Sequence, residues 1–264
     1  MPHHAAGAPG AIHLVLQGKG GVGKSFVALH LAQYFVDCGV PTAIFDSDPL
    51  TPTLSNFEAL AARYINFMLD DDELDVAQFD VLANEIVEAS GRVVVLDTGS
   101  SNFIPLMGYL RSNDVLRVFA ELGRHVVIHS VLVGGAGARE TLAGLVSMTE
   151  NLPADGYVAW LNSFLGPVLF DGKSFEETKA FGELRDKLTG IVRIKHRRGT
   201  NQMLHLKALQ EMTRRHLTYK EAMATAQFSL WDRQRLAEAR REVNRQLSAI
   251  FGCEVPLATP VGEG

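Results

Sequence analysis

Residues 18–25 read GKGGVGKS, and this stretch constrains the fold of the chain more than any other. It matches the phosphate-binding loop pattern G-x-x-x-x-G-K-[ST], whose fixed positions are Gly18, Gly23, Lys24 and Ser25. An apolar run just before it predicts a buried strand, and apolar residues at helical spacing after it predict a helix. Because strand, glycine loop and helix follow in that order, we expect a phosphate site rather than an incidental glycine-rich turn.

Each part of this loop has a chemical task. Glycines let successive backbone N–H groups point at one phosphate, and the N-terminus of the following helix adds positive potential. Lys24 is expected to reach the β- and γ-phosphates, and the hydroxyl of Ser25 is expected to bind Mg²⁺. The other residues predicted to contact the nucleotide are Gly18, Lys19, Gly20, Gly21, Val22, Gly23 and Phe26.

Apolar runs and helical patterns alternate along most of the sequence. Strands are expected at 12–17, 42–46, 92–97, 125–133, 157–161 and 190–194, and helices near 76–89 and 138–150. Runs that are apolar on both faces predict a mostly parallel sheet covered by helices on both sides, which is a doubly wound α/β fold.

Beyond residue 198 only helical patterns occur, and 229–251 predicts an amphipathic helix that packs onto its own domain. We therefore expect an ATPase core at 12–198 with a helical C-terminal part of the same domain at 199–251. Flexible tails are expected at 1–11 and 252–264.

The composition excludes several classes of protein. With 47% hydrophobic and 21% charged residues, the 264-residue chain is an ordinary globular sequence, and its net charge of −5 predicts no general affinity for nucleic acid. No apolar run approaches the ~18 residues that a membrane span needs, and residues 1–11 lack the features of a signal peptide, so a cytoplasmic protein is expected. The two cysteines, Cys38 and Cys253, predict neither a disulfide framework nor a metal cluster.

Three aspartates follow predicted strands. Asp46 and Asp48 end the second strand, and Asp97 ends the third. Phosphate-loop folds bind their ligand beyond the carboxyl ends of parallel strands, so these acids should lie near the loop. Asp97 is the natural acid to hold Mg²⁺, directly or through water.

The second lysine of the loop, Lys19, makes the segment similar to the deviant Walker A motif, K-G-G-x-G-K-[ST], of the ParA/MinD family of P-loop ATPases. That resemblance implies a homodimer in which Lys19 reaches the partner's ATP, as an arginine finger does. The segment Asp46-Ser47-Asp48-Pro49 resembles the family's D-x-D-P, which implies that Asp46 supports the metal and Asp48 positions the attacking water.

Asn162 ends the fifth predicted strand and offers both a donor and an acceptor to an adenine. The resemblance places a base-contacting asparagine near this point, and the N-K-x-D motif of guanine readers is missing. ATP is therefore expected, with Mg²⁺. The alternative is that Asn162 caps the loop before Gly166 and Pro167.

Within the family, the chain is most similar to the TraL conjugal-transfer proteins of plasmids. The shared segments are Leu16-Gln17, Asp46-x-Asp48-Pro49, Asp97-x-Gly99 with Ser101-x-Phe103-x-Pro105-Leu106, and Trp160-Leu161-Asn162 with Gly166-Pro167. The resemblance implies partners in the conjugation machinery. The departures from the ParA pattern are Phe26 in place of a hydroxyl, Leu50 in place of glutamine, and no proline after Asp97, so slow ATP hydrolysis or an ATP-bound switch is expected.

Other proteins share this loop and fold but have different functions. The main alternative is a small-molecule ATP-dependent ligase or kinase of the dethiobiotin-synthetase type, for which no dedicated substrate signature is present. An iron–sulfur or metal carrier would need a paired-cysteine motif. A membrane switch of the MinD type would need a basic amphipathic C-terminal helix, and 256–264 cannot form one, so no membrane insertion is expected.

One segment is a candidate for non-specific DNA binding. The segment 193–215 contains seven basic residues and one acidic residue, Glu211, which gives it a local charge of +6. The basic residues are Arg193, Lys195, Arg197, Arg198, Lys207, Arg214 and Arg215. Such clustering is typical of phosphate binding, although a charge run is also typical of a solvated helix face.

Overall fold

A computed structural model describes residues 7, 10–67, 75, 77–164, 166–194 and 200–255, without the side chains of 200–202. The predicted flexible tails fall largely outside these residues, as do Lys195, Arg197 and Arg198 of the basic segment.

Seven strands form one parallel sheet in the order β3-β2-β4-β1-β5-β6-β7. Their bounds are β1 Ile12–Val15, β2 Thr42–Ser47, β3 Arg63–Tyr64, β4 Val93–Thr98, β5 Val126–Leu132, β6 Gly156–Asn162 and β7 Leu188–Ile194. The order reverses at β1, so the sheet is doubly wound and the prediction of the fold class is confirmed.

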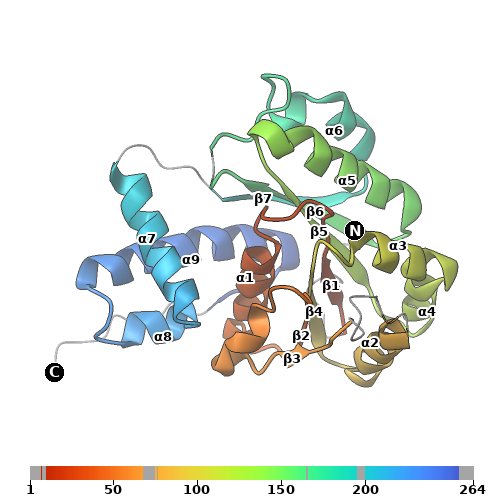
Figure 1. Ribbon diagram of the computed structural model, residues 1–264, viewed down its shortest axis with the longest axis horizontal. Coiled ribbons are helices and arrows are strands. Elements are labelled where there is room, and N and C mark those ends of the chain that lie inside the picture. The colour runs from red at the N-terminus through yellow and green to blue at the C-terminus, as the bar shows by residue number, and fades with distance from the viewer. Residues whose placement is uncertain are drawn as a thin grey trace.

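Helices cover both faces of this sheet (Figure 1). The α-helices are α1 Lys24–Asp37, α2 Ala77–Glu88, α3 Phe103–Ser112, α4 Val115–Glu121, α5 Ala138–Asn151, α6 Lys179–Leu184, α7 Thr200–Arg214, α8 Tyr219–Ala224 and α9 Leu230–Phe251. Short 3-10 turns lie at Leu54–Asn56, Glu58–Leu60, Gly135–Gly137 and Phe175–Glu177. In the described segments, no helix combines the length and apolar character that crossing a bilayer requires.

The alternation of side chains along each strand divides the core in two. Val93 and Val95 of β4 belong to a cluster with α1, α7, α8 and α9, whereas Val94 and Leu96 belong to a cluster with α2 to α6. Because successive residues of a strand point to opposite faces, a run of four apolar residues serves both clusters. This is why the inner strands read as continuous apolar runs.

All six predicted strands are present, with ends that differ by two residues or fewer. The additional strand, β3, is a two-residue edge strand whose residues, Arg63 and Tyr64, are exposed and form no apolar pattern. The helices α3, α4, α6 and α8 were also not predicted, because each is short and gives little periodic signal.

The long helix α9 fastens the C-terminal part of the chain to the sheet. Its amphipathic pattern buries Leu236, Val243 and Leu247, and Ser229 and Gly252 cap its two ends. Arg240 on α9 forms a largely buried ion pair with Asp37 at the end of α1, at 2.6 Å. Helix α9 is therefore held against α1, the helix that begins at the glycine loop.

Candidate functional site

The glycine loop lies between β1 and α1, at the carboxyl edge of the sheet (Figure 1). Gly21 and Gly23 have φ angles of 71° and 98°, a left-handed conformation that favours glycine. A Cβ on Gly23 would lie 2.8 Å from the amide nitrogen of Asn162. The sequence therefore supplies glycine where the backbone both turns and approaches β6 closely.

Gln17 positions the start of the loop. Its amide nitrogen donates to Ser130 Oγ, to the carbonyl of Val131 and to the carbonyl of Thr141, at 3.1 to 3.2 Å. Its amide oxygen accepts the backbone N–H of Gly18 at 2.9 Å. This buried residue therefore joins the loop to β5 and α5. Its position next to the motif in the sequence did not predict these contacts.

Lys24 is almost completely buried at the first position of α1. Its ammonium donates to the carbonyl of Lys19 at 3.3 Å. Burial lowers the pKa of Lys24, and the negative charges of Asp97 and Asp48 oppose that effect. A buried cation held beside carboxylates is prepared for a strongly charged ligand such as a phosphate chain.

Asp97, at the fifth position of β4, is fully buried, and apart from the nearby Ser25 hydroxyl its carboxylate oxygens have no hydrogen-bond donor among the described residues. Burial raises the pKa of Asp97 to about 7, with a further increase from the charges of Asp46 and Asp48. The nearby Ser25 hydroxyl and the charge of Lys24 act in the opposite direction. Buried polar atoms without partners are costly, so this carboxylate is best explained by a ligand that binds there.

Asp46 lies beside Asp97 on the neighbouring strand β2. One of its oxygens accepts the backbone N–H of Asp48 at 3.2 Å, and the other accepts the backbone N–H and the hydroxyl of Ser55 at 3.0 and 3.2 Å. Burial raises the pKa of Asp46, and these hydrogen bonds lower it. Asp46 therefore holds the loop that follows β2, and Ser55, which has no sequence signal, is its main partner.

Asp48 is nearly buried and organises the turn that follows it. Its carboxylate accepts the backbone N–H groups of Leu50 and Thr51 at 3.0 and 3.1 Å, and the Thr51 hydroxyl at 3.1 Å. A Cβ on Gly99 would lie 2.9 Å from the same carboxylate, so the loop after β4 needs glycine there. In this structure the Asp48 carboxylate holds the turn that follows β2 and lies against the loop that follows β4.

The donor set suits Mg²⁺ rather than a metal held by protein alone. No group of three His, Cys, Asp or Glu side chains in the described residues could hold a metal ion. Magnesium usually binds one or two protein oxygens and completes its shell with substrate phosphates and water. The buried Asp97 carboxylate and the adjacent Ser25 hydroxyl match that requirement.

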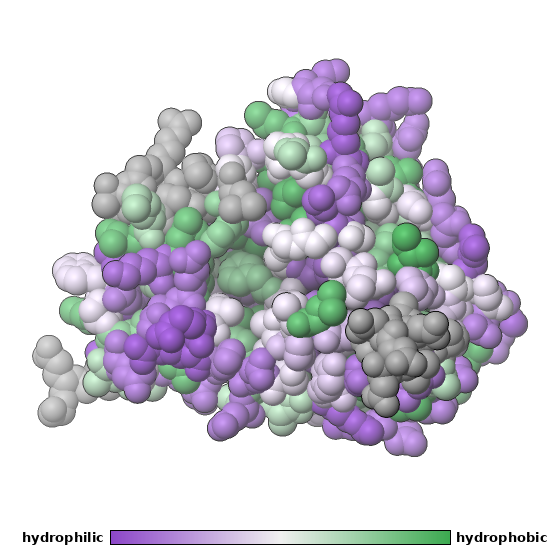
Figure 2. Space-filling view, viewed as in Figure 1, coloured by the Kyte–Doolittle hydropathy of each residue, from purple (hydrophilic) through white to green (hydrophobic). Residues whose placement is uncertain are grey.

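Next to the loop is a pocket of about 320 Å³. Gly21, Val22, Gly23, Phe26, Val133, Asn162, Phe164, Leu209, Gln210, Thr213 and Arg214 line it. The space-filling view shows a hollow with hydrophobic side chains between α7 and the body of the protein (Figure 2). Its apolar walls and polar rim are typical of a pocket for a flat, partly polar group such as a nucleotide base.

Asn162, the predicted base-contacting residue, lies at the edge of this pocket. Its amide nitrogen donates to the carbonyl of Val22 at 2.8 Å, and its amide oxygen accepts the backbone N–H of Phe164 at 3.0 Å. In this structure Asn162 ties the glycine loop to the end of β6. These contacts correspond to the loop-capping alternative, and adenine contact remains a prediction.

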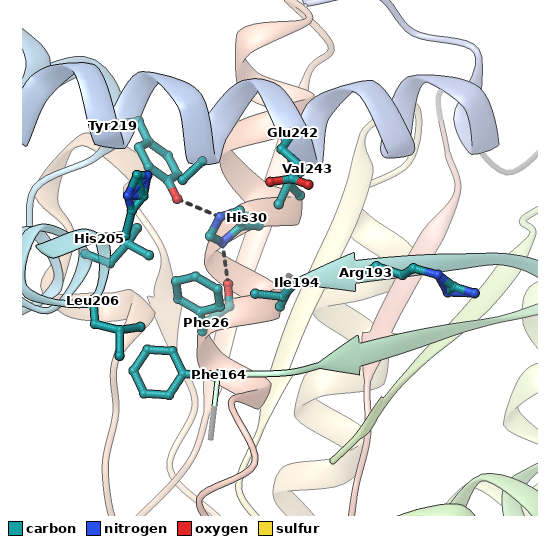
Figure 3. A pocket seen from close by; sticks show the side chains of 12 residues that line it. Phe26, His30, Phe164, Arg193, Ile194, His205, Leu206, Tyr219, Glu242 and Val243 are labelled. Atoms are coloured by element: carbon teal, nitrogen blue, oxygen red, sulfur yellow. Dashed lines mark hydrogen bonds between the residues drawn. The ribbon is translucent and has the colours of Figure 1, made fainter. Parts of the chain in front are cut away.

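A second, smaller hollow of about 50 Å³ shares Phe26, Phe164 and Leu209 with the first. Figure 3 shows His30 at its centre, bonded on one side to the Phe26 carbonyl at 2.9 Å and on the other to the Tyr219 hydroxyl at 2.8 Å. Burial lowers the pKa of His30 to about 4, so the imidazole is neutral. Phe26 therefore stands between the larger pocket and the C-terminal helices.

Lys19, the lysine expected to act in a dimer, lies on the outer side of the loop. Its side chain is 42% exposed and forms an ion pair with Glu140 of α5. Glu140 was not identified from the sequence, although an acid in the first turn of a helix next to the loop is a usable signal.

The basic segment is partly neutralised in its described portion. Arg193 pairs with Glu176, and its side chain points away from the small hollow (Figure 3). Arg214 and Arg215 both pair with Glu211. Lys207 is exposed, and the remaining basic residues of the segment lie outside the described residues.

A parallel sheet with a glycine loop, a buried lysine and a buried acid at its carboxyl edge defines a P-loop nucleotide-binding protein. The family model for the CobQ/CobB/MinD/ParA nucleotide-binding domain matches residues 13–242, and the chain belongs to this family.

Within that family the chain is similar to two proteins of Escherichia coli that are both named Protein TraL. One is 37% identical over 239 residues, which are 90% of this chain and 97% of the relative. The other is 35% identical over 237 residues, which are 89% and 96% of the two chains. The chain is thus a TraL-like member of the ParA/MinD group, and the predicted resemblance is confirmed.

The chain is also similar to solved structures. A chain of the MinC:MinD cell division protein complex from Aquifex aeolicus aligns with a TM-score of 0.47 and 13% identity, covering 94% of this chain and 98% of that one. A plasmid partition protein from Borrelia burgdorferi aligns with a TM-score of 0.42 and 17% identity, covering 69% and 90%.

Proposed function

We propose that this protein binds Mg-ATP and acts as a nucleotide-dependent dimerisation switch in plasmid conjugal transfer, with slow ATP hydrolysis. The observation that carries the proposal is the fully buried Asp97 carboxylate, which has no donor apart from the Ser25 hydroxyl among the described residues and lies next to Lys24. A Mg²⁺ ion and a phosphate chain would satisfy all three groups at once.

We assign separate roles in binding to the residues of the site. The loop backbone and Lys24 bind the phosphates, Ser25 and Asp97 hold the metal, and Asp46 supports the loop beside it. When bound, Mg²⁺ neutralises charge on the phosphate oxygens. The Asp48 carboxylate, which keeps acceptor capacity beside the three hydrogen bonds of its turn, accepts a hydrogen bond from the attacking water and orients it.

The pocket of about 320 Å³ supports binding of a base next to the phosphates. Phe26, Phe164 and Leu209 would enclose the ring, and the Gln210 and Thr213 side chains at the rim would offer hydrogen bonds to its edge. ATP is proposed over GTP because the guanine-reading motif is missing from the segment after Asn162.

The role in conjugal transfer rests on the 37% and 35% identity to the TraL proteins. We propose partners in the conjugation machinery for the same reason. Mating assays with a deletion strain test this: the intact gene should restore DNA transfer, and the gene encoding Lys24→Ala should not.

Size-exclusion chromatography with light scattering, with and without Mg-ATP, tests the switch. A monomer that becomes a dimer with Mg-ATP supports the proposal. A chain that binds Mg-ATP but stays monomeric contradicts the switch and favours the small-molecule ligase or kinase alternative. Absence of ATP binding, measured by calorimetry, would overturn both.

A further inference from the structure

The fold brings together the two cysteines of the chain, which lie near opposite ends of the sequence. Cys38 is the C-terminal capping residue of α1, and Cys253 directly follows Gly252, the C-terminal capping residue of α9. Both thiols are free, both residues are partly exposed, and both pack against the same hydrophobic cluster. An oxidant in solution can therefore reach a pair of thiols at the surface where α1 and α9 end.

Tyr34 holds the two cysteines in place. The backbone N–H of Cys38 donates to the Tyr34 carbonyl at 3.0 Å, one helical turn earlier. The Tyr34 hydroxyl donates to the Cys253 carbonyl at 2.6 Å. Tyr34 of α1 thus contacts both cysteines, Cys38 through its backbone carbonyl and Cys253 through its side-chain hydroxyl, so the two cysteines lie on either side of one residue.

The thiols themselves are close neighbours. Burial, together with contact with the Cys253 thiol, raises the pKa of the Cys38 thiol to about 12. Neighbouring thiols on a rigid backbone are the prerequisite for a disulfide, because a disulfide demands a narrow range of separations. A thiol whose pKa is raised reacts slowly at neutral pH, so the reaction should accelerate with pH.

We propose that Cys38 and Cys253 form a reversible disulfide within one chain when the protein meets a disulfide oxidant such as oxidised glutathione. The Cys253 thiolate attacks one sulfur of oxidised glutathione, which forms a mixed disulfide and releases one glutathione thiolate. The Cys38 thiolate then attacks the Cys253 sulfur and releases the second glutathione. Two protein thiols are oxidised, two protons are released to solvent or to the departing thiolates, and one glutathione disulfide is reduced to two thiols.

The bond would join the end of the helix that starts at the glycine loop to the end of the longest C-terminal helix. It would close a loop that contains most of the chain and so restrict the unfolded state. The expected consequence is a rise in the midpoint of thermal unfolding of about 5 °C or more, reversed by a reductant.

The full-length protein is incubated with oxidised glutathione at pH 8, quenched with an alkylating reagent and analysed by intact mass. The expected product has lost two hydrogens, takes up no alkylating reagent and carries no glutathione. Dithiothreitol should restore both thiols, and formation should be faster at pH 9 than at pH 7. The same chain in denaturant should form far less of this product, because the fold no longer brings the thiols together.

Cys38→Ser and Cys253→Ser are the matched controls, and each should retain at most one glutathione without a rise in the unfolding midpoint. Tyr34→Phe should slow closure several-fold while leaving the thiol count unchanged. Two glutathione adducts on the native chain, unreacted thiols or disulfide-linked dimers would each overturn the proposal. A disulfide that leaves the unfolding midpoint unchanged would contradict the proposed joining of α1 and α9.

Discussion

The ammonium of Lys19 lies 3.0 Å from a carboxylate oxygen of Glu140, in the first turn of α5 of the same chain. Both side chains are about half exposed, and exposed ion pairs contribute about 0–1 kcal/mol. Lys19 can therefore leave Glu140 at little cost when a more strongly charged partner, such as a triphosphate, comes within reach.

The two loop lysines should separate binding from dimerisation. Lys24→Ala is expected to weaken Mg-ATP binding by about 100-fold or more, because a buried charge-assisted contact is lost. Lys19→Ala should keep binding within about threefold of the wild type, since this side chain points outward, but it should lose the ATP-dependent dimer. Calorimetry and light scattering measure the two properties.

Glu140→Gln serves as the control for that pair, since it releases Lys19 without removing it. It should retain both ATP binding and the dimer, with Glu150→Gln on the same helix as the matched exposed substitution. Equal losses of monomer affinity in Lys19→Ala and Lys24→Ala would disprove the role of Lys19 across the dimer.

Asp48→Asn should slow ATP hydrolysis by about tenfold or more and leave Mg-ATP bound, so that the dimer becomes long-lived. The reason is that the amide retains the turn but orients water less well than a carboxylate. Thr51→Val, which removes one hydrogen bond to Asp48 and keeps the carboxylate, should have a smaller effect. The measurement is the rate of ATP hydrolysis in a single turnover. An unchanged rate in Asp48→Asn would show that another residue positions the water.

Asp97→Asn should stabilise the nucleotide-free protein while removing the Mg²⁺ dependence of ATP binding. The carboxylate charge is fully buried and lies near the charges of Asp46 and Asp48, so replacing it by an amide should raise the free energy of unfolding by about 1–3 kcal/mol. Urea unfolding without nucleotide and calorimetry with and without Mg²⁺ measure both effects. A less stable Asp97→Asn protein would contradict this explanation of the carboxylate.

Acid should destabilise the fold through buried neutral histidines. The pKa of His30 is about 4 in the folded state against an ordinary value of 6.5, and burial also holds the pKa of His129 well below its usual range. Below pH 6.5 the unfolded chain takes up protons that the folded chain refuses, so stability is complete above that pH and falls as the pH drops toward 4.

For His30 alone the loss is on the order of 3 kcal/mol at pH 4. Urea unfolding between pH 8 and pH 5 should show a shallower pH dependence for His30→Gln than for the wild type. Parallel pH profiles for the wild type and His30→Gln would rule out this contribution.

DNA binding through the basic segment 193–215 should be weak, independent of sequence, stronger with ATP and steeply reduced by salt. Arg197→Glu combined with Arg198→Glu should reduce affinity by about tenfold or more at low salt and lower the salt dependence by roughly two phosphate contacts. Arg117→Glu on α4, which pairs with Asp114 and Glu121, is the matched control. Fluorescence anisotropy with random duplex DNA tests this, and no binding with ATP would refute it.

The strands and the loop were predictable because their signals are local. Four consecutive apolar residues such as 93–96 indicate a strand buried on both faces, and the spacing of Gly18, Gly23 and Lys24 indicates a phosphate loop, without knowledge of any distant residue. The edge strand β3 and the short helices carry no such pattern. Their positions follow from the packing of the elements around them.

The sequence by itself thus determined the sheet, the glycine loop and the edge at which Asp46 and Asp97 lie, since chain direction places the ends of parallel strands together. Only the tertiary structure decided what each side chain touches. It paired Asp46 with Ser55, Lys19 with Glu140 and Asn162 with Val22, and it brought Cys38 to Cys253. Apart from the contact of Asp46 with Ser55, which lies within one loop, those contacts join residues far apart in the chain, and they depend on the way helices pack on a completed sheet, which local spacing does not encode.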